Sequence, residues 1–412
     1  MHITIIGAGI IGIQTAHALL DDGHTVELID PDGLATRTSR GNAGYIAHTD
    51  ILPLASPKIW RHLPRWLLDP LGPLSIRPSY ALAIAPWMLR FIAASTPARI
   101  EASTQALIAL NGMALGAWER RLGKLGLGET HLRRKGLLSV FSSASGLPAS
   151  LTMVERQRQL GIAVEVLDST AAVRTLEPAL SASAVAGLLY PGMVSVDDPA
   201  SITSAVGEAA LARGAVLIRQ PVSRVRLVEA GVATTLSDGV VRSSDLAVIA
   251  AGAWSRDLAR QLDDEIPLDT ERGYNITLRQ GALGLTRPVT FEGLGFVSTP
   301  LDSGDRIGGA VEFAGLTAVP NYARLDAILA RARPLLPDAD FTGGTRWMGF
   351  RPSLPDSLPV ISRSGASDRI IYAFGHGHYG LTQSAATGEL VAQLAGQQRT
   401  AIDLLPFDAK RF

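Results

Sequence analysis

The feature that most constrains the fold is a glycine-rich turn near the start of the chain. Residues 2–6 form a short, β-branched and mostly apolar run, which indicates a buried strand. Three glycines follow it in the spacing G-x-G-x-x-G: Gly7, Gly9 and Gly12. Apolar residues then recur at helical intervals over residues 10–20, and residues 25–29 indicate a second strand that ends at Asp30. The sequence therefore predicts a complete βαβ unit.

Each part of this unit has a physical role in binding a dinucleotide. Gly7 permits a tight turn, Gly9 lets the backbone approach a pyrophosphate, and Gly12 lets the helix pack closely on the strand. The helix N-terminus offers free N–H groups and about half a positive charge to the phosphates. Asp30 can accept hydrogen bonds from both ribose hydroxyls and would repel a 2′-phosphate, which disfavours NADP. The unit alone leaves FAD and NAD open.

Composition narrows the class of protein. At 412 residues the chain is long enough for two domains, and its 47% apolar and 18% charged residues are typical of a globular enzyme. Basic and acidic residues balance at 38 each, so no overall field favours nucleic acid. The sequence contains no cysteine, which excludes disulfides, zinc–thiolate and iron–sulfur sites, a thiol nucleophile and a thioether bond to a flavin.

The cellular location is predicted from the absence of a targeting sequence and of a membrane-spanning pattern. Met1 leads directly into the first strand without a basic leader, and no apolar run approaches the roughly 20 residues of a bilayer span. A cytoplasmic location is expected. Residues 80–91 are apolar and favour a core helix, although a patch on the inner face of the cell membrane stays open as the alternative.

Two further segments resemble ligand-binding turns. Ser39, Asn42, Ala43 and Gly44 lie in a polar, glycine-rich run that could close over a cofactor. The apolar strand at residues 246–250 ends in small residues, among them Ala251 and Gly252, which would let the backbone approach a ligand.

A third such turn follows an apolar strand at residues 370–374. It carries three glycines in six residues and then begins a helix over residues 380–394, whose N-terminal dipole could stabilise an anionic ring. His376 and His378 lie in this turn, but two imidazoles without a third ligand make a poor metal site, so no metal is expected.

These motifs together resemble a known family. Ser39-x-x-Asn42-Ala43-Gly44 after a dinucleotide unit is similar to the D-amino acid dehydrogenase branch of the FAD-dependent amine oxidoreductases, relatives of glycine, sarcosine and D-amino acid oxidases. Residues 349–361 resemble that family's G-x-R-P-x-x-x-D-x-x-P-x-I element, and residues 176–199 its return into the FAD domain. The resemblance covers nearly the whole chain and implies FAD, bound non-covalently, in place of NAD.

The resemblance implies an α/β fold in two domains. A Rossmann-type FAD-binding domain, discontinuous in sequence, is expected at residues 1–80, 150–255 and 340–412. An inserted substrate-binding domain of α+β type with an antiparallel sheet is expected at residues 81–149 and 256–339. Asp197 and Asp198 precede a proline at a helix start and are interpreted as capping and turn residues rather than catalytic ones.

Candidate site residues follow from the motifs and the resemblance. The expected FAD contacts are Gly7, Ala8, Gly9, Ile10, Ile11, Gly12, Asp30, Ser39, Asn42, Ala43, Gly44, Val222, Ala251, Gly252, Gly377, His378, Gly380, Leu381 and Thr382. Arg351 is expected to hold a substrate carboxylate with its planar fork, and an internal salt bridge is the alternative. The family places a Gly-Tyr pair near the substrate, so Tyr274 is a candidate contact, with simple packing as the alternative. His48 is a candidate hydrogen-bond donor to substrate, or a local structural residue.

The resemblance implies oxidation of a small D-amino or imino acid, D-alanine-like or like D-proline and hydroxy-D-proline, a reaction of amino acid catabolism. Hydride would pass from Cα to flavin N5 and leave an imino or keto acid, without need of a general base. The electron acceptor, whether quinone, another flavoprotein or electron carrier, or O2, is not fixed, nor is the choice between oxidase and dehydrogenase. A glycine- or sarcosine-type amine oxidase and a flavoprotein subunit of a larger complex remain as alternatives.

Overall fold

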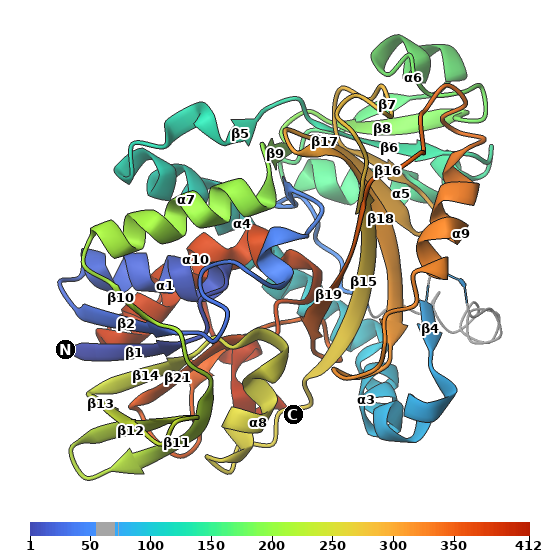
Figure 1. Ribbon diagram of the computed structural model, residues 1–412. Coiled ribbons are helices and arrows are strands. Elements are labelled where there is room, and N and C mark those ends of the chain that lie inside the picture. The colour runs from blue at the N-terminus through green and yellow to red at the C-terminus, as the bar shows by residue number, and fades with distance from the viewer. Residues whose placement is uncertain (55–70, 73) are drawn as a thin grey trace.

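The structure is a computed structural model that describes residues 1–54, 71–72 and 74–412. Two large sheets divide the molecule, as Figure 1 shows: a parallel sheet that carries the N-terminus, and a long, mostly antiparallel sheet beside it. The mixed α/β architecture that we predicted is therefore confirmed. The sequence has a Pro- and Trp-rich stretch whose Trp60 and Trp66 lie outside the described residues.

The parallel sheet contains the predicted βαβ unit. Its strands in spatial order are β10 (Val216–Ile218), β2 (Thr25–Ile29), β1 (His2–Ile6), β14 (Leu246–Ile249), β21 (Ile370–Phe374) and β20 (Val360–Arg363). Only β20 runs antiparallel to its neighbour. The sheet is buried on both faces, because Ile3 and Ile5 of β1 face one hydrophobic cluster and Ile6 faces another. This two-sided burial explains why the strands consist of continuous apolar runs.

Different elements cover the two faces of this sheet. On one face lie the helices α1 (Ile10–Asp21), α4 (Pro97–Lys124), α7 (Pro199–Ala212) and α10 (Gly380–Ala395). On the other lie α8 (Ser255–Arg260) and a small sheet of β11 (Val222–Val228), β12 (Gly231–Leu236) and β13 (Val241–Ser244). Asp198 caps α7 by accepting hydrogen bonds from the N–H groups of Ala200 (2.7 Å) and Ser201 (3.1 Å), as expected from the sequence.

The second large sheet joins strands from distant parts of the chain. In spatial order they are β19 (Thr345–Ser353), β15 (Asp269–Thr277), β18 (Gly304–Phe313), β17 (Phe296–Leu301), β16 (Val289–Phe291), β6 (Leu137–Phe141), β8 (Ala186–Tyr190) and β7 (Glu165–Leu167), with β4 (Leu74–Ile76) added beside β18. Helix α9 (Ala323–Ala332) packs on β15 and β18. The remaining elements are α3 (Ala81–Ala94), α5 (Gly146–Gln159), α6 (Thr170–Leu176), and a small sheet of β3 (Tyr45–Ile46), β9 (Val194–Val196) and β5 (Leu132–Arg133).

Sheet membership crosses the predicted domain boundaries in three places. Strand β4, within residues 1–80, pairs with β18 of the second sheet. Within residues 150–255, β8 pairs with β6 and β7 pairs with β8, and within residues 340–412, β19 pairs with β15. We had assigned all three stretches to the FAD-binding domain. Short apolar strands carry no sequence signal for the sheet they join, because their partners are distant in the chain.

Helix α3 covers the residues for which a core helix or a membrane patch was expected. One face packs Ile84, Trp87 and Phe91 into a cluster with Phe313, whereas Leu82 on the other face is 91% exposed. Among the described residues no single helix has the length and apolar character of a membrane span, although the pair Pro78–Ala94 and Pro97–Lys124, bent by 89°, meets those limits jointly.

The contact between α1 and α10 yields a stability prediction. A Cβ added to Gly388 would lie 2.6 Å from the Gln14 carbonyl oxygen of α1, so the helices could not keep their spacing. We expect Gly388→Ala to lower the free energy of unfolding by about 1–3 kcal/mol, the usual cost of overpacking. Urea unfolding measures this change. The matched control is Gly112→Ala on the exposed side of α4, where nothing lies within 4 Å. It should stabilise the helix by about 0.5–1 kcal/mol, and an equal effect of both variants would contradict the packing argument.

Candidate functional site

The glycine turn after β1 is built by backbone contacts that only glycine allows. Gly7 has a φ of +112°, and a Cβ there would lie 2.3 Å from the carbonyl oxygen of Ala250, at the end of β14. A Cβ on Gly12 would lie 1.9 Å from the Gly7 carbonyl oxygen. The two parallel strand ends and the start of α1 therefore meet with no side chain between them, as the dinucleotide motif requires.

Asp30 stands at the end of the neighbouring strand β2 and is tied to the same turn. Its Oδ2 accepts a hydrogen bond from the Ala8 N–H (2.9 Å), and its Oδ1 accepts one from the Asp32 N–H (3.0 Å). Each carboxylate oxygen still has a free lone pair and can accept a further bond from a ribose hydroxyl.

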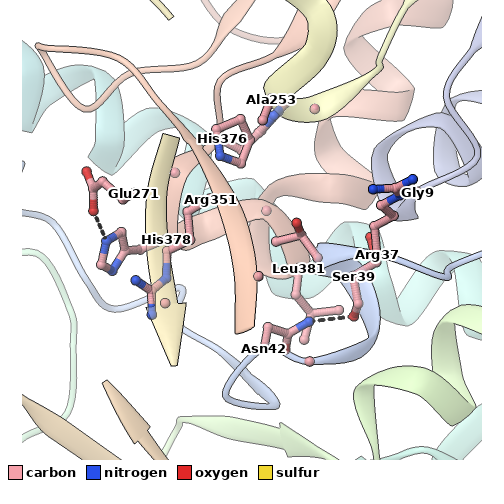
Figure 2. A pocket seen from close by; sticks show the side chains of 18 of the residues that line it. Gly9, Arg37, Ser39, Asn42, Ala253, Glu271, Arg351, His376, His378 and Leu381 are labelled. Atoms are coloured by element: carbon pink, nitrogen blue, oxygen red, sulfur yellow. Dashed lines mark hydrogen bonds and ion pairs between the residues drawn. The ribbon is translucent and has the colours of Figure 1, made fainter. Parts of the chain in front are cut away.

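The predicted polar loop lies against the start of α1. Ser39 Oγ accepts a hydrogen bond from the Ile10 N–H (2.9 Å), and the Asn42 side chain donates to the Ser39 carbonyl (2.8 Å) and accepts from the Gly44 N–H (2.9 Å). Arg306, on strand β18 of the second sheet, donates a hydrogen bond of 2.8 Å to the Asn42 carbonyl oxygen. The loop is thus held from both sides, and Figure 2 shows Asn42 bonded to Ser39.

These elements surround one cavity of about 1070 Å³, at the upper end of the roughly 300–1,000 Å³ typical of cofactor and ligand sites. The N-termini of α1 and α10 both border it, since Ile10 and Gly380 are lining residues. The predicted cofactor contacts that line it are Gly7, Gly9, Ile10, Ile11, Asp30, Ser39, Asn42, Ala43, Gly44, Val222, Ala251, Gly252, Gly377, His378, Gly380 and Leu381.

Three predicted cofactor residues support the cavity without lining it. Ala8 donates its N–H to Asp30, and Gly12 packs on Gly7 as described above. Thr382 Oγ1 accepts a hydrogen bond from the Ala47 N–H at 2.9 Å. We predicted direct contact for all three, but a turn or helix end exposes only part of its residues to the ligand, and sequence spacing does not show which part.

Arg351 lies where a substrate carboxylate could reach it. Its side chain borders the cavity and lies over the backbone of Gly273, and its Nη1 donates to the Ala310 carbonyl at 3.1 Å. Within the described residues it forms no ion pair, so the internal salt bridge that we had considered is absent there. Burial lowers the pKa of Arg351 and Glu271 opposes that shift, yet an arginine stays protonated.

The other two candidate catalytic residues, Tyr274 and His48, both have structural contacts within the protein, and of the two only Tyr274 borders the cavity. Tyr274 borders the cavity, but its hydroxyl donates to Glu312 and accepts from the Asn321 N–H (3.1 Å), in the core of the second sheet. His48 is not a lining residue, and its Nδ1 lies 3.2 Å from the Ile46 carbonyl oxygen. Both side chains therefore have the structural contacts that we had named as alternatives.

Sequence reasoning missed a group of acids and phenols in the cavity. Asp50, Glu292, Tyr45 and Tyr379 all line it, and none belongs to a recognisable motif. Burial and then the nearby Glu292 raise the pKa of Asp50 to about 7, and burial also raises the pKa of Glu292. Both carboxylates have accessible surface because they face the cavity, and the protein atoms around them supply the desolvation that raises each pKa.

Arg37 and Trp254 were also missed, near the opposite end of the cavity. The Arg37 guanidinium lies 4.7 Å from the centre of the Trp254 ring and pairs with Asp32, and Figure 2 shows Arg37 close to Gly9. A cation beside the glycine turn adds to the positive field of the helix N-terminus. The only sequence feature that indicates a role for Arg37 is its position five residues after Asp32.

Comparisons with known proteins agree with this site. The model of a family described as FAD dependent oxidoreductase matches residues 2–394. The chain is 36% identical to a D-amino-acid oxidase from Bradyrhizobium diazoefficiens, over 100% of this chain and 99% of the other, and 31% identical to a D-amino acid dehydrogenase from Allorhizobium ampelinum, over 98% and 96%. Its fold is similar to that of glycine oxidase from Geobacillus kaustophilus, with a TM-score of 0.78, 21% identity, and coverage of 100% and 98%.

The chain therefore belongs to the family of FAD-dependent oxidoreductases. The residues present fit FAD: the glycine turn brings two strand ends and a helix start together without side chains between them, two helix N-termini face the cavity, and Asp30 is placed for a ribose. The prediction of FAD over NAD is confirmed.

Asp30 allows a direct test of cofactor binding. In Asp30→Asn the amide oxygen can still accept from Ala8, but it bonds a ribose hydroxyl more weakly than a carboxylate does. We expect the Kd for FAD to rise about tenfold, or about 1.4 kcal/mol. Titration of the apoprotein with FAD, followed by flavin fluorescence, gives the Kd. Asp22→Asn, exposed just after α1, is the control. An unchanged Kd for Asp30→Asn would remove Asp30 from the binding site.

Proposed function

We propose that this protein oxidises a small D-amino or imino acid at the Cα–N bond, with FAD as the hydride acceptor. The observation that carries the proposal is the distribution of charge in the cavity. Arg351 offers one unpaired cation, and Asp50 and Glu292 offer two carboxylates without a cationic partner among the described residues. An amino acid carries the complementary pair of charges, a carboxylate and an ammonium group.

Tyr45 connects the two charged regions of the cavity. Asp50 and Glu292 both raise the pKa of its phenol beyond the effect of burial, whereas Arg351 opposes them, so all three charges act on this one side chain. A small amino acid could therefore place its carboxylate at Arg351 and its ammonium group toward the acids. The apolar side chains of Trp87, Met88 and Phe91 line the same cavity and could contact the rest of the substrate.

The roles of the protein in the reaction follow from this arrangement. FAD, when bound, would supply the acceptor of one hydride, that is, of a proton together with two electrons. Arg351 orients the substrate by its carboxylate, which fixes the position of Cα. We expected no general base from the sequence, but the ammonium group must lose a proton before the amine nitrogen can release electron density, and the Asp50 carboxylate, which lines the cavity, can accept that proton. Water then hydrolyses the imino acid to the keto acid, and the nitrogen leaves as ammonia or, from a cyclic substrate, remains on the opened chain as an amine.

The relatives support the class of substrate without deciding the individual compound. The two most similar proteins described above carry the names D-amino-acid oxidase and D-amino acid dehydrogenase. D-alanine-like acids and cyclic ones such as D-proline or hydroxy-D-proline are our candidates, with a quinone, another electron carrier or O2 as the final acceptor. A cytoplasmic location, with peripheral membrane contact as an option, belongs to the same proposal.

A spectroscopic screen tests the function directly. The purified protein should be yellow, and anaerobic addition of D-amino acids, D-proline, sarcosine or glycine should show which of them bleaches the flavin. Bleaching by a D-amino or D-imino acid supports the proposal. Bleaching by glycine or sarcosine alone would favour the amine oxidase alternative, and no bleaching at all would favour a flavoprotein subunit.

Arg351→Met tests the carboxylate site. Loss of the charged fork should raise KM for the D-amino acid about 10- to 100-fold, because hydrogen bonds to charged groups contribute about 1.5–3 kcal/mol, while FAD stays bound. Steady-state kinetics and the flavin spectrum measure both quantities. Arg346→Met, on the same strand but paired with Asp326 at the surface, is the matched control. Similar KM values for the two variants would refute the role of Arg351.

Asp50 predicts a specific pH dependence. Below its pKa of about 7 the side chain is protonated and cannot accept the proton of the substrate ammonium group. The value of kcat/KM should therefore rise as the pH increases through about 7, and Asp50→Asn should lose this inflection. An inflection from the amine of the free substrate is common to both enzymes. Asp368→Asn, whose side chain is 84% exposed, serves as the control. A profile that Asp50→Asn leaves unchanged would exclude Asp50 as the proton acceptor.

A further inference from the structure

Two opposite charges face each other across the strands β15 and β19 and yet do not pair. The register places Glu271 directly opposite Arg351, and both side chains line the cavity. Opposite charges at directly facing positions normally attract and stabilise a sheet, since their Cβ atoms are only about 4.5–5.5 Å apart. Here no ion pair forms between them.

The oxygens of Glu271 are instead bound by two other groups. Oε2 lies 2.7 Å from Nε2 of His378, at the turn before α10, and Oε1 accepts a hydrogen bond from the Ser353 hydroxyl. Glu271 is only 3% exposed, so these two contacts fix its position. Burial alone would raise its pKa, but His378, Ser353 and Arg351 together hold the pKa below its usual value, so the carboxylate is ionised. Figure 2 shows the bond between Glu271 and His378 beside Arg351.

Arg351 has its own contacts, which keep it away from Glu271. Its Nη1 donates to the Ala310 carbonyl on β18 (3.1 Å), and its guanidinium lies flat over Gly273. A Cβ on Gly273 would come within 2.3 Å of the Arg351 Cζ, so a side chain at this position would displace the guanidinium. Most of the guanidinium hydrogen-bonding capacity remains unused, because Arg has five N–H donors.

We propose that His378 and Ser353 act as positioning residues: they hold the Glu271 carboxylate away from Arg351 and so keep the guanidinium available for a substrate carboxylate. The inference rests on the proposed function in that the ligand of Arg351 is taken to be a carboxylate. Glu271 still neutralises part of the Arg351 charge through space, without occupying its donors. If either tether is removed, Glu271 can turn toward Arg351 and compete with the substrate.

The test compares single and double variants. His378→Ala removes one tether and Ser353→Ala the other, and each should raise KM for the D-amino acid about tenfold with little change in kcat. Glu271→Gln carries no charge to compete, so KM should remain near that of the unchanged protein. The double variant His378→Ala/Glu271→Gln should therefore recover the low KM. FAD content is measured for every variant, because His378 also lines the cavity.

A second readout does not depend on catalysis. Propionate carries a carboxylate but cannot be oxidised as an amino acid, and its Kd can be measured by calorimetry on the FAD-loaded protein. The Kd should rise in His378→Ala and Ser353→Ala and recover in the double variant.

The outcomes separate the inference from the proposed function. A double variant as weak as His378→Ala, in both KM and Kd, would overturn the inference, as would a Glu271→Gln variant as impaired as Arg351→Met. If no D-amino acid bleaches the flavin of the unchanged protein, the proposed function fails, while the propionate affinities still decide the role of the tethers.

Discussion

The contact between the backbones of Gly7 and Ala250 is the constraint on which the rest of the site depends. It joins the ends of two neighbouring parallel strands, β1 and β14, with no side chain between them. The start of α1 can then reach the cavity, and the loop at Ser39 can lie against it. Any larger residue at position 7 would separate the strand ends and displace the helix N-terminus that faces the cofactor.

The charge of the cavity comes from side chains that form no ion pair within the described part of the chain. Arg351 has no ionic partner among the described residues although Glu271 faces it, and in the same part of the chain Asp50 and Glu292 repel each other without a cation paired to either. Such groups are costly to bury unless a ligand completes them. Unpaired charges would destabilise a sheet that had only a structural role. Here they prepare the cavity to bind a molecule with two opposite charges.

The sequence predicted the cofactor half of the site well because its signals are local. Glycine spacing, strand ends and the acid at Asp30 lie within thirty residues, and the structure brings them together as expected. The substrate half was harder to predict. Gly273 and Tyr274 are adjacent on β15 and both border the cavity, yet the Tyr274 hydroxyl is bonded to Glu312 in the core, which the sequence does not show. Asp50 and Glu292 are distant in sequence and come together only in the tertiary fold, and neither belongs to a recognisable motif.

The order of strands in the parallel sheet has a consequence for how the chain is made. Strand β1 stands between β2 and β14, and β14 pairs in turn with β21 at residues 370–374, close to the end of the chain. During synthesis β1 therefore keeps an unpaired apolar edge until β14, more than half of the way along the polypeptide, has left the ribosome. Long-range pairing of this kind is slow to form and favours association with other chains in the interval. Yield in a cell would then depend on chaperones that cover this edge.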